Sequence, residues 1–251
     1  MRLAVTGAPD FSPVARSYAT SRPGYPAELF AWLASVVPAH DVAWDTATGS
    51  GQAAIGLGTY FARVVASDVS AAQVAHAKRT PRVAYCVSHA ETAPLAAHSV
   101  DLVVAAAALH WFDRPRFYDE ARRVLRPGGV LAAWTYHVAH VAPPFDAILG
   151  PFYRDVVAPY FAPGARLVDG RYAAIELPGV ALTAPSFEMT AQWTAAEILR
   201  FVGTWSGVHA YRRSTGQDPA RALADRLDAV CGARGAPHTL RWPVYLRAAR
   251  V

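Results

Sequence analysis

The chain has few of the features that define several large protein classes. Its 251 residues include only two cysteines, Cys86 and Cys231, which predicts neither a disulfide framework nor a cysteine metal site. The nine histidines show no ligand spacing with acidic residues, so no metal is expected. The longest fully apolar run, Leu102 to Leu109, is far shorter than the roughly 20 residues that cross a bilayer. We therefore expect no membrane partner.

Signals for export and for nucleic-acid binding are also weak. The first residues lack a basic region followed by an apolar stretch, so we expect no secretory signal and a cytoplasmic location. A net charge of +5 and a pI of about 9.4 permit an anionic partner. However, the arginines are scattered in runs no longer than two, and Lys78 is the only lysine. We attribute the charge to compositional bias and expect no nucleic-acid partner.

A regular alternation of apolar strands and helices fills the first half of the chain. We expect strands at 42–45, 64–68, 83–87, 100–106 and 130–136, and helices at 27–37, 52–61, 70–79 and 116–125. The alternation predicts a doubly wound α/β fold around a mainly parallel sheet. A length of 251 residues with 53% hydrophobic content suits one domain.

The most informative motif follows the first expected strand. It reads Asp45-Thr46-Ala47-Thr48-Gly49-Ser50-Gly51, and Asp68 stands at the tip of the second strand. Glycines in such a turn let the backbone pass close to a ligand. An acid at the tip of the next strand can accept hydrogen bonds from a ribose diol. The motif therefore predicts a cofactor that contains adenosine.

Two cofactors compete for this motif. Gly49-Ser50-Gly51-Gln52-Ala53-Ala54 satisfies the dinucleotide fingerprint, which favours an NAD-type oxidoreductase. Asp45 argues against that alternative, because a carboxylate beside the turn would repel a pyrophosphate. A carboxylate there suits a cationic ligand instead, and S-adenosylmethionine (SAM) carries both an ammonium and a sulfonium group.

Further motifs follow the fourth and fifth expected strands: His110-Trp111-Phe112-Asp113 and Arg126-Pro127-Gly128-Gly129. With the glycine turn, they resemble the class I SAM-dependent methyltransferases. The likeness is to the small-molecule branch (methyltransferase type 11) that includes trans-aconitate and ubiquinone/menaquinone-type C-methyltransferase-like proteins, and it runs from Phe11 to about Tyr136. It implies a Rossmann-like seven-stranded sheet closed by an antiparallel edge. Ala47 departs from the pattern, which usually has glycine there.

This resemblance divides the single expected domain, 1–251, into four segments. They are an N-terminal cap at 11–40, a SAM-binding core at 41–136, a lid insertion at 137–180, and closing strands and helix at 181–251. The lid segment is rich in proline and aromatic residues and is expected to be helical. In the last segment we expect a strand at 181–189, a helix at 195–205 and a strand at 240–248.

The resemblance also implies the cofactor-binding residues. They are Tyr18, Arg22, Asp45, Ala47, Gly49, Gly51, Asp68, Val69, Ala90, Glu91 and Ala106. Asp68 would bind the ribose hydroxyls, and Ala90 and Glu91 would flank the adenine. Arg22 could pair with the cofactor's carboxylate, for which the guanidinium geometry is well suited. The alternative is that the arm carrying Tyr18 and Arg22 is packed only for stability.

His110 is the sharpest feature on the acceptor side. It follows the fourth strand, where the family places residues that face the transferred methyl group. His110 could act as a general base or hold the acceptor by a hydrogen bond, and the alternative is a buried histidine bonded to the backbone. SAM is already activated, so the main task of such an enzyme is in-line positioning. The product would be S-adenosylhomocysteine.

Aromatic side chains are the other candidates for binding the acceptor. The predicted substrate residues are Trp111, Trp134, Tyr136, Trp193 and Trp205, with His137, Phe152, Tyr153, His209 and Tyr211 as further candidates. If they meet at one site, they favour a flat acceptor, such as a nitrogen or oxygen atom of an aromatic or heterocyclic secondary metabolite. Alternatives are a small carboxylic acid, which an arginine pair in the pocket would favour, and a non-catalytic SAM-binding protein. The protein is expected to be a monomer or homodimer.

Overall fold

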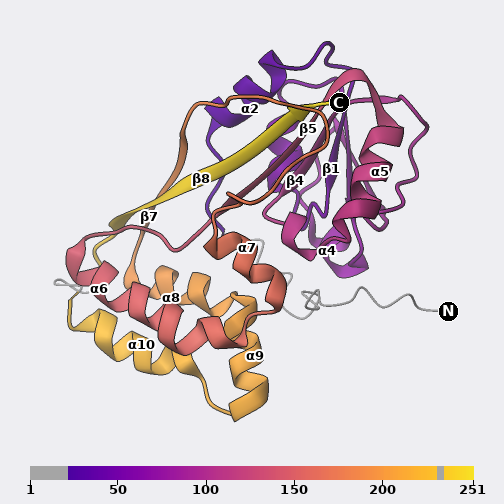
Figure 1. The fold of residues 1–251 in the computed structure, drawn as a ribbon. Helices are drawn as coiled ribbons and strands as arrows, with labels where there is room; N and C mark the ends of the chain where they lie inside the picture. Colours follow the sequence, from indigo (N-terminus) through magenta and orange to yellow (C-terminus); the bar gives the residue numbers. More distant parts are fainter. Residues whose placement is uncertain (1–21, 231–234) are drawn as a thin grey trace.

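The computed structural model describes residues 22–230 and 235–251 and contains one mainly parallel sheet with helices on both faces (Figure 1). The sheet order is β3-β2-β1-β4-β5-β8, and both β6 and β7 pair with β8. The strands are β1 (Val42–Thr46), β2 (Arg63–Asp68), β3 (Val83–Val87), β4 (Val100–Ala106), β5 (Leu125–Tyr136), β6 (Val180–Ala181), β7 (Phe187–Trp193) and β8 (His238–Arg250). β1 to β5 are parallel, and β8 runs antiparallel to its neighbours. The predicted α/β fold is confirmed.

The sheet buries both of its faces because its central strands are apolar on both sides. In β4, Leu102 and Val104 belong to the core on one face, while Val103 and Ala105 belong to the core on the other. Helix α2 (Ala27–Ser35) precedes β1, whereas α3 (Gln52–Leu57), α4 (Ala71–His76) and α5 (Arg114–Val124) follow β1, β2 and β4. Side-chain caps set the starts of α4 and α5, since Ser70 accepts from the Gln73 backbone amide and Asp113 from the Arg116 backbone amide.

The edge beyond β8 gives eight strands where seven were expected. One strand was predicted at 181–189, but the structure has the two-residue β6 and the longer β7 on the same side of β8. The Leu182 amide continues the ladder to Ala248, and Pro185, which has no amide hydrogen, lies in the gap. The expected edge strand is therefore present as two interrupted pieces.

A layer of helices gathers at one end of the sheet (Figure 1). It comes from two separate segments of the chain. Between β5 and β6 lie α6 (Pro143–Pro151), the π-helix η3 (Phe152–Val157), the short helices η4 (Ala158–Tyr160) and η5 (Pro163–Ala165), and α7 (Arg166–Asp169). Between β7 and β8 lie α8 (Ala195–Gly203), α9 (Ser206–Thr215) and α10 (Pro219–Asp228). Only α8 was expected in the second segment.

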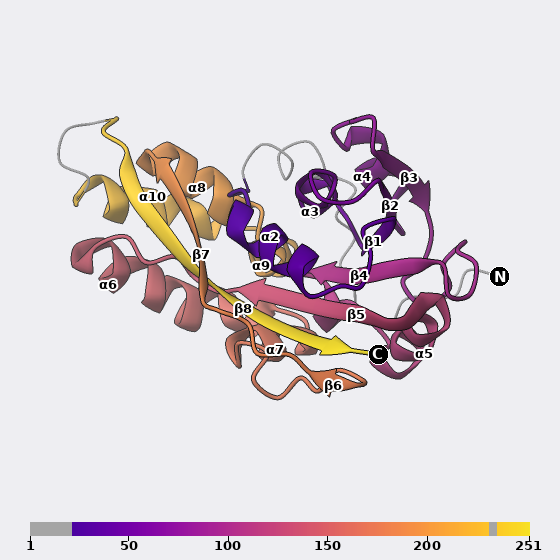
Figure 2. The same cartoon turned by 90° about the horizontal axis from the view of Figure 1, so that it is seen from above.

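β8 is long enough to join this helical layer to the sheet. Its C-terminal half pairs with β5 inside the sheet, and its N-terminal half pairs with β7 (Figure 2). The core is continuous along this path, since Trp242 and Phe201 pack edge to face with ring centroids 5.7 Å apart. In the part of the chain that the structure describes, no helix is long and apolar enough to cross a membrane.

Candidate active site

The glycine turn joins the end of β1 to α3 in an unusual backbone conformation. Ala47, Gly49 and Gly51 all have positive φ, at 52°, 55° and 86°. Glycine adopts this region freely, but alanine pays a steric cost of roughly 1 kcal/mol. A Cβ on Gly51 would also lie 2.1 Å from the Tyr85 hydroxyl. Conformation therefore favours glycine at position 51, where a Cβ would also displace the Tyr85 hydroxyl, whereas Ala47 tolerates strain where the family pattern has glycine.

Asp45 is fully buried at the end of β1, beneath the turn. Its Oδ2 accepts a hydrogen bond from the Thr48 hydroxyl at 2.5 Å, while Oδ1 has no hydrogen-bond partner among the described residues. Burial raises the pKa of Asp45 to about 7, an effect that the Thr48 hydroxyl and the nearby Ala54 amide partly offset. A buried carboxylate oxygen without a partner costs free energy unless a ligand supplies the missing donor.

Asp68 ends β2 and ties the glycine turn to the next helix. Its Oδ2 accepts from the Gly49 amide at 2.9 Å, and its Oδ1 accepts from the Ser70 amide at 2.8 Å. Burial raises the pKa of Asp68, and these two amides partly counteract the shift. Each carboxylate oxygen has a second lone pair, so Asp68 can still accept from a diol. Val69, the next residue, is 51% exposed at the same edge.

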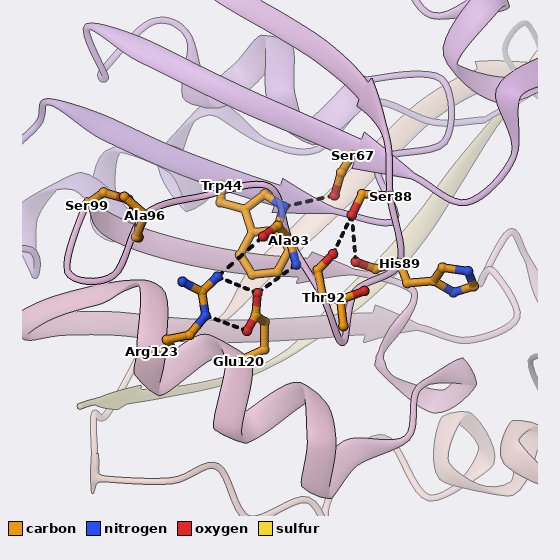
Figure 3. A network of polar contacts seen from close by, with 10 residues as sticks. All are labelled: Trp44, Ser67, Ser88, His89, Thr92, Ala93, Ala96, Ser99, Glu120 and Arg123. Atoms are coloured by element: carbon orange, nitrogen blue, oxygen red, sulfur yellow. Dashed lines mark hydrogen bonds and ion pairs between the residues drawn. The ribbon is translucent and has the colours of Figure 1, made fainter. Parts of the chain in front are cut away.

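The loop after β3 carries Ala90 and Glu91 to this edge, and contacts from α5 hold it in place (Figure 3). The Ala93 amide donates to Glu120 at 2.6 Å, and the Arg123 guanidinium contacts both the Glu120 carboxylate and the Ala93 carbonyl. Arg123 is the main reason why the pKa of Glu120 is lowered. Ala90 is buried, and Glu91 accepts from the Asp113 amide at 3.0 Å.

A pocket opens beside this edge, between the ends of β4 and β5 and the helical layer. It encloses about 730 Å³, including its mouth. Its lining residues are Arg22, Ala107, His110, Trp111, Thr135, Tyr136, His137, Val138, Tyr153, Phe161, Ala165, Val168, Phe201, Trp205 and Ser206. Within the described parts of the chain, none of these lining residues is acidic. The walls are thus mainly aromatic, with one arginine and two histidines.

Arg22 connects the pocket to the glycine turn. Its carbonyl accepts from the side-chain amide of Gln52, the first residue of α3, at 3.3 Å. Its guanidinium donates to the Tyr136 hydroxyl at 2.9 Å and lies over the Phe201 ring, 5.0 Å from the centroid. The predicted arm therefore does reach the site through Arg22. Its other predicted member, Tyr18, lies outside the described residues.

His110 stands in the short helix η2 (Leu109–Trp111), which begins shortly after β4. Its Nδ1 is hydrogen-bonded to the Tyr172 hydroxyl at 2.7 Å, and the backbone of Gly164 packs against its carbonyl oxygen. Burial lowers the pKa of His110 to about 3, so the ring is neutral at physiological pH. A base with so low a pKa removes protons poorly, so its geometry favours a hydrogen-bonding role over that of a general base.

A second polar group in the pocket was not predicted as a unit. Asp169, at the end of α7, accepts through Oδ1 from both His137 Nε2, at 3.1 Å, and the Tyr153 hydroxyl, at 2.5 Å. The His137 and Tyr153 rings pack edge to face with centroids 4.6 Å apart. Both were named as single aromatic candidates, but no sequence motif signals Asp169. The proline-rich run around it was the only local indication that this segment covers the site.

The predicted substrate residues separate into two groups. Trp111, Tyr136 and Trp205 line the pocket. Trp134 is fully buried and packs against Tyr25, at 5.3 Å between ring centroids. The candidates that are not among its lining residues are Trp134, Trp193, Phe152, His209 and Tyr211. For these residues the structure supports the alternative that they serve in packing or elsewhere on the surface.

The cofactor edge and the pocket lie side by side. Ala106, at the end of β4, precedes Ala107 in the pocket wall, and β4 pairs with β1 up to Thr46 beside Ala105. The end of β4 therefore lies between the glycine turn after β1 and the pocket wall at Ala107. Among the residues in 22–230 and 235–251, no group of histidine, cysteine and acidic side chains could hold a metal ion.

Comparisons with known proteins agree on one activity. The sequence profile of the family described as "Methyltransferase domain" matches residues 44–133. A "putative methyltransferase" of Dictyostelium discoideum is 32% identical over 233 residues, covering 86% of this chain and 84% of the relative. An "uncharacterized methyltransferase" of Mycobacterium bovis is 34% identical over 122 residues, about half of each chain. The solved structure of a "putative type II methyltransferase" from Anaeromyxobacter dehalogenans superposes with a TM-score of 0.84 at 43% identity, over 91% of this chain and 97% of that one.

Proposed function

Because the chain belongs to the class I SAM-dependent methyltransferases, we propose that it methylates an oxygen or nitrogen atom of a small aromatic acceptor held in the pocket between Arg22 and Trp205. The observation that carries this proposal is the pocket itself. Six of its lining side chains are tryptophan, tyrosine or phenylalanine, and it opens beside the glycine turn. Aromatic walls bind planar ligands through area burial and ring stacking.

The residues at the sheet edge fit SAM, the methyl donor of this family. The buried Oδ1 of Asp45 lacks a partner, and an ammonium group would provide one. In this proposal Asp68 would use its remaining lone pairs to bind the ribose hydroxyls. Ala90 and Glu91 would flank the adenine, and Ala106 would present its carbonyl to the methionine end. SAM supplies a methyl group on a positively charged sulfur, which needs no further activation. The dinucleotide alternative has no support from the three relatives described above, which are named as methyltransferases.

The protein's own residues would position the acceptor and keep water away from it. Holding two reactants at near-attack distance converts a bimolecular step into an effectively unimolecular one. Trp205 and Tyr153 pack edge to face on the helical side, 5.6 Å apart, while Tyr136 and Arg22 form the wall next to the sheet. We propose that the helical layer acts as the lid over this pocket.

A small carboxylic acid is the second candidate acceptor, and Arg22 is the observation in its favour. Its guanidinium faces the pocket but already donates to Tyr136 and stacks on Phe201. The adjacent arginines Arg212 and Arg213 do not line the pocket, and Arg212 is paired with Asp218. With a single arginine and mainly aromatic walls, the pocket favours the aromatic acceptor.

Calorimetric titration with SAM, S-adenosylhomocysteine and NAD tests the cofactor assignment. We expect SAM and S-adenosylhomocysteine to bind, and Asp68→Asn and Asp68→Ala to weaken that binding by about 1–3 kcal/mol. Asp119→Ala is the matched control, because that carboxylate is 79% exposed on α5, away from the edge. Binding of NAD in place of SAM would overturn the assignment.

Formation of S-adenosylhomocysteine with two acceptor panels then tests the acceptor class. One panel holds phenols and nitrogen heterocycles, and the other holds aliphatic carboxylates such as trans-aconitate. We expect turnover in the aromatic panel, and Trp205→Ala to raise KM for its members. Turnover only with the carboxylates, reduced by Arg22→Gln, would favour the second candidate. SAM binding without turnover of either panel would contradict the proposed activity and point to a non-catalytic SAM-binding protein.

A further inference from the structure

Two histidines line the pocket, and they have different partners. His110 is bonded to the hydroxyl of Tyr172, a neutral group buried in the core below η2. His137 is bonded to the carboxylate of Asp169. The partner decides what an imidazole can do, because an adjacent carboxylate stabilises the charged imidazolium and a neutral hydroxyl does so far less.

The Asp169 contact also fixes the tautomer of His137. A carboxylate only accepts hydrogen bonds, so the hydrogen in this contact lies on Nε2 of His137. In the neutral ring, Nδ1 then carries a lone pair and can accept a proton. A carboxylate that orients a histidine in this way, with the opposite ring nitrogen left for chemistry, is the arrangement of catalytic histidine–aspartate pairs.

Tyr153 holds Asp169 in place from the other side. Its hydroxyl donates to the same oxygen, Oδ1, that accepts from His137. Burial and the Asp169 carboxylate raise the pKa of Tyr153, so this hydroxyl keeps its proton and remains a donor. Tyr153 stands in the π-helix η3, a rare element that often occurs at functional sites, and its ring also packs against Phe161, at 5.5 Å between centroids.

From this geometry we propose that His137, oriented by Asp169, is the general base that takes the proton from an aromatic hydroxyl bound in the pocket. The inference deepens the proposed function and rests on it. The hydroxyl proton moves to His137 Nδ1, and the acceptor oxygen uses its lone pair to form the new bond to the methyl carbon. The electron pair of the broken sulfur–carbon bond stays on sulfur. His137 afterwards releases its proton to water.

The proposal narrows the acceptor to a phenol-like group. A phenol loses its proton near neutral pH far more readily than an alcohol, so a histidine base matches it well. Arg22, on the wall next to the sheet, adds a positive charge that favours the phenolate over the phenol. His110, held neutral by burial, does not compete for the proton. Asp169 has its charge directed at His137 and Tyr153, and no acidic side chain among the described residues lines the pocket.

The test uses 4-nitrophenol, whose yellow phenolate is distinguished from its colourless phenol by absorbance. Wild-type protein saturated with S-adenosylhomocysteine is titrated with this probe at pH 6, where most of the free probe is protonated. We expect the phenolate-to-phenol ratio of the bound probe to be about tenfold higher than that of the free probe, which corresponds to a pKa of the bound probe that is lower by about one unit. His137→Gln should leave only the phenolate enrichment that Arg22 causes. Asp169→Asn should reduce the part of the enrichment that is due to His137.

Two controls separate proton transfer from loss of structure. His140→Gln removes a histidine near Asp146 that is 67% exposed and outside the pocket lining, so it should leave the phenolate signal unchanged. S-adenosylhomocysteine binding by calorimetry should be equal in the wild type, His137→Gln and Asp169→Asn. If His137→Gln loses S-adenosylhomocysteine binding, His137→Asn replaces it and is judged by the same measurements.

The results that would refute the base assignment differ from the results that would refute the proposed methyltransferase function. Equal phenolate enrichment in the wild type and in His137→Gln, with S-adenosylhomocysteine still bound, overturns the base assignment and leaves the methyltransferase proposal standing. Failure of 4-nitrophenol to bind overturns the phenol-like acceptor. With turnover measured as well, His137→Gln should slow methylation of unsubstituted 2-naphthol far more than that of the already ionised 4-nitrophenolate. An equal slowing would indicate a structural role and contradict the proposal.

Discussion

Replacing Asp45 by asparagine tests the cost of keeping a carboxylate beneath the glycine turn. Burial raises the pKa of Asp45 to about 7 in the folded protein, from an ordinary value of 3.8. A carboxyl with a higher pKa in the folded than in the unfolded state makes the folded state bind protons more tightly. Its contribution therefore favours folding at low pH and is lost as the pH rises from 3.8 to about 7.

The size of the effect follows from that difference. At about 1.36 kcal/mol for each pH unit, the gap between 3.8 and about 7 corresponds to roughly 4 kcal/mol of stability lost above pH 7. Asparagine has no charge to bury, but its amide pays its own desolvation cost, about 1–3 kcal/mol at both high and low pH. Because this desolvation cost is the same at every pH, it cancels when the stabilities measured at two pH values are subtracted. Between pH 5 and pH 8 the stability of Asp45→Asn relative to the wild type should rise by about 2.6 kcal/mol.

Urea denaturation of SAM-free protein at these two pH values measures this change directly. The same variant should bind SAM more weakly, because the partner proposed for the ammonium group loses its charge. A more stable protein that binds its ligand less well is the expected trade-off at a site that carries functional strain. If the stability difference between Asp45→Asn and wild type is the same at pH 5 and pH 8, burial does not raise the pKa of Asp45 and the argument fails.

Two further predictions concern other positions in the fold. Asp101→Asn should destabilise the protein by about 3–5 kcal/mol in urea denaturation at pH 7. The reason is that the Asp101 carboxylate is fully buried, pairs with Arg126 at 2.7 Å and accepts hydrogen bonds from two backbone amides. A loss below about 1 kcal/mol would contradict this account. Ala47→Gly should raise stability by up to about 1 kcal/mol in a thermal melt, and Ala47→Val should lower it, since φ is 52° at this position; identical melting of the two variants would show that the turn is not strained.

The sheet could be predicted because its signals are local. β4 is a continuous apolar run, and such a run is typical of a buried parallel strand. Ser70 caps α4 as its position predicts, through contacts within three residues. The glycine turn, too, follows from residues that are adjacent in sequence. In each case the physical cause and the visible pattern lie within the same short stretch of chain.

The helical layer was predicted only in part because its stability comes from packing between distant segments. α9 (Ser206–Thr215) is polar and carries Arg212 and Arg213 in its last turn, so its sequence alone has little tendency to mark a helix. It is held by contacts with η3 and η4, which lie in the other inserted segment. Tyr160 and Tyr211, for example, pack with centroids 4.8 Å apart across that junction. No local pattern reports such a contact.

Trp134 shows how an aromatic residue near a site can still belong to the core. Trp134 and Tyr136 are two residues apart on β5 and therefore face the same side of the sheet. Tyr25, just before α2, covers Trp134, whereas β5 ends at Tyr136 and leaves that ring at the pocket wall. The alternation of the strand predicts the shared face correctly. Which of the two rings is covered depends on a segment more than a hundred residues away.

The two pocket histidines likewise depend on contacts between residues that are far apart in the sequence. The motif that follows β4 drew attention to His110, yet the structure pairs that ring with a neutral tyrosine hydroxyl 62 residues away. His137 belongs to no motif, and its aspartate partner lies 32 residues along the chain. The side chains are chemically identical, but burial keeps the His110 ring neutral, whereas the carboxylate of Asp169 orients His137 as the proposed base. A histidine's sequence position can therefore place it in a site, while its burial and its long-range hydrogen bond determine what it does there.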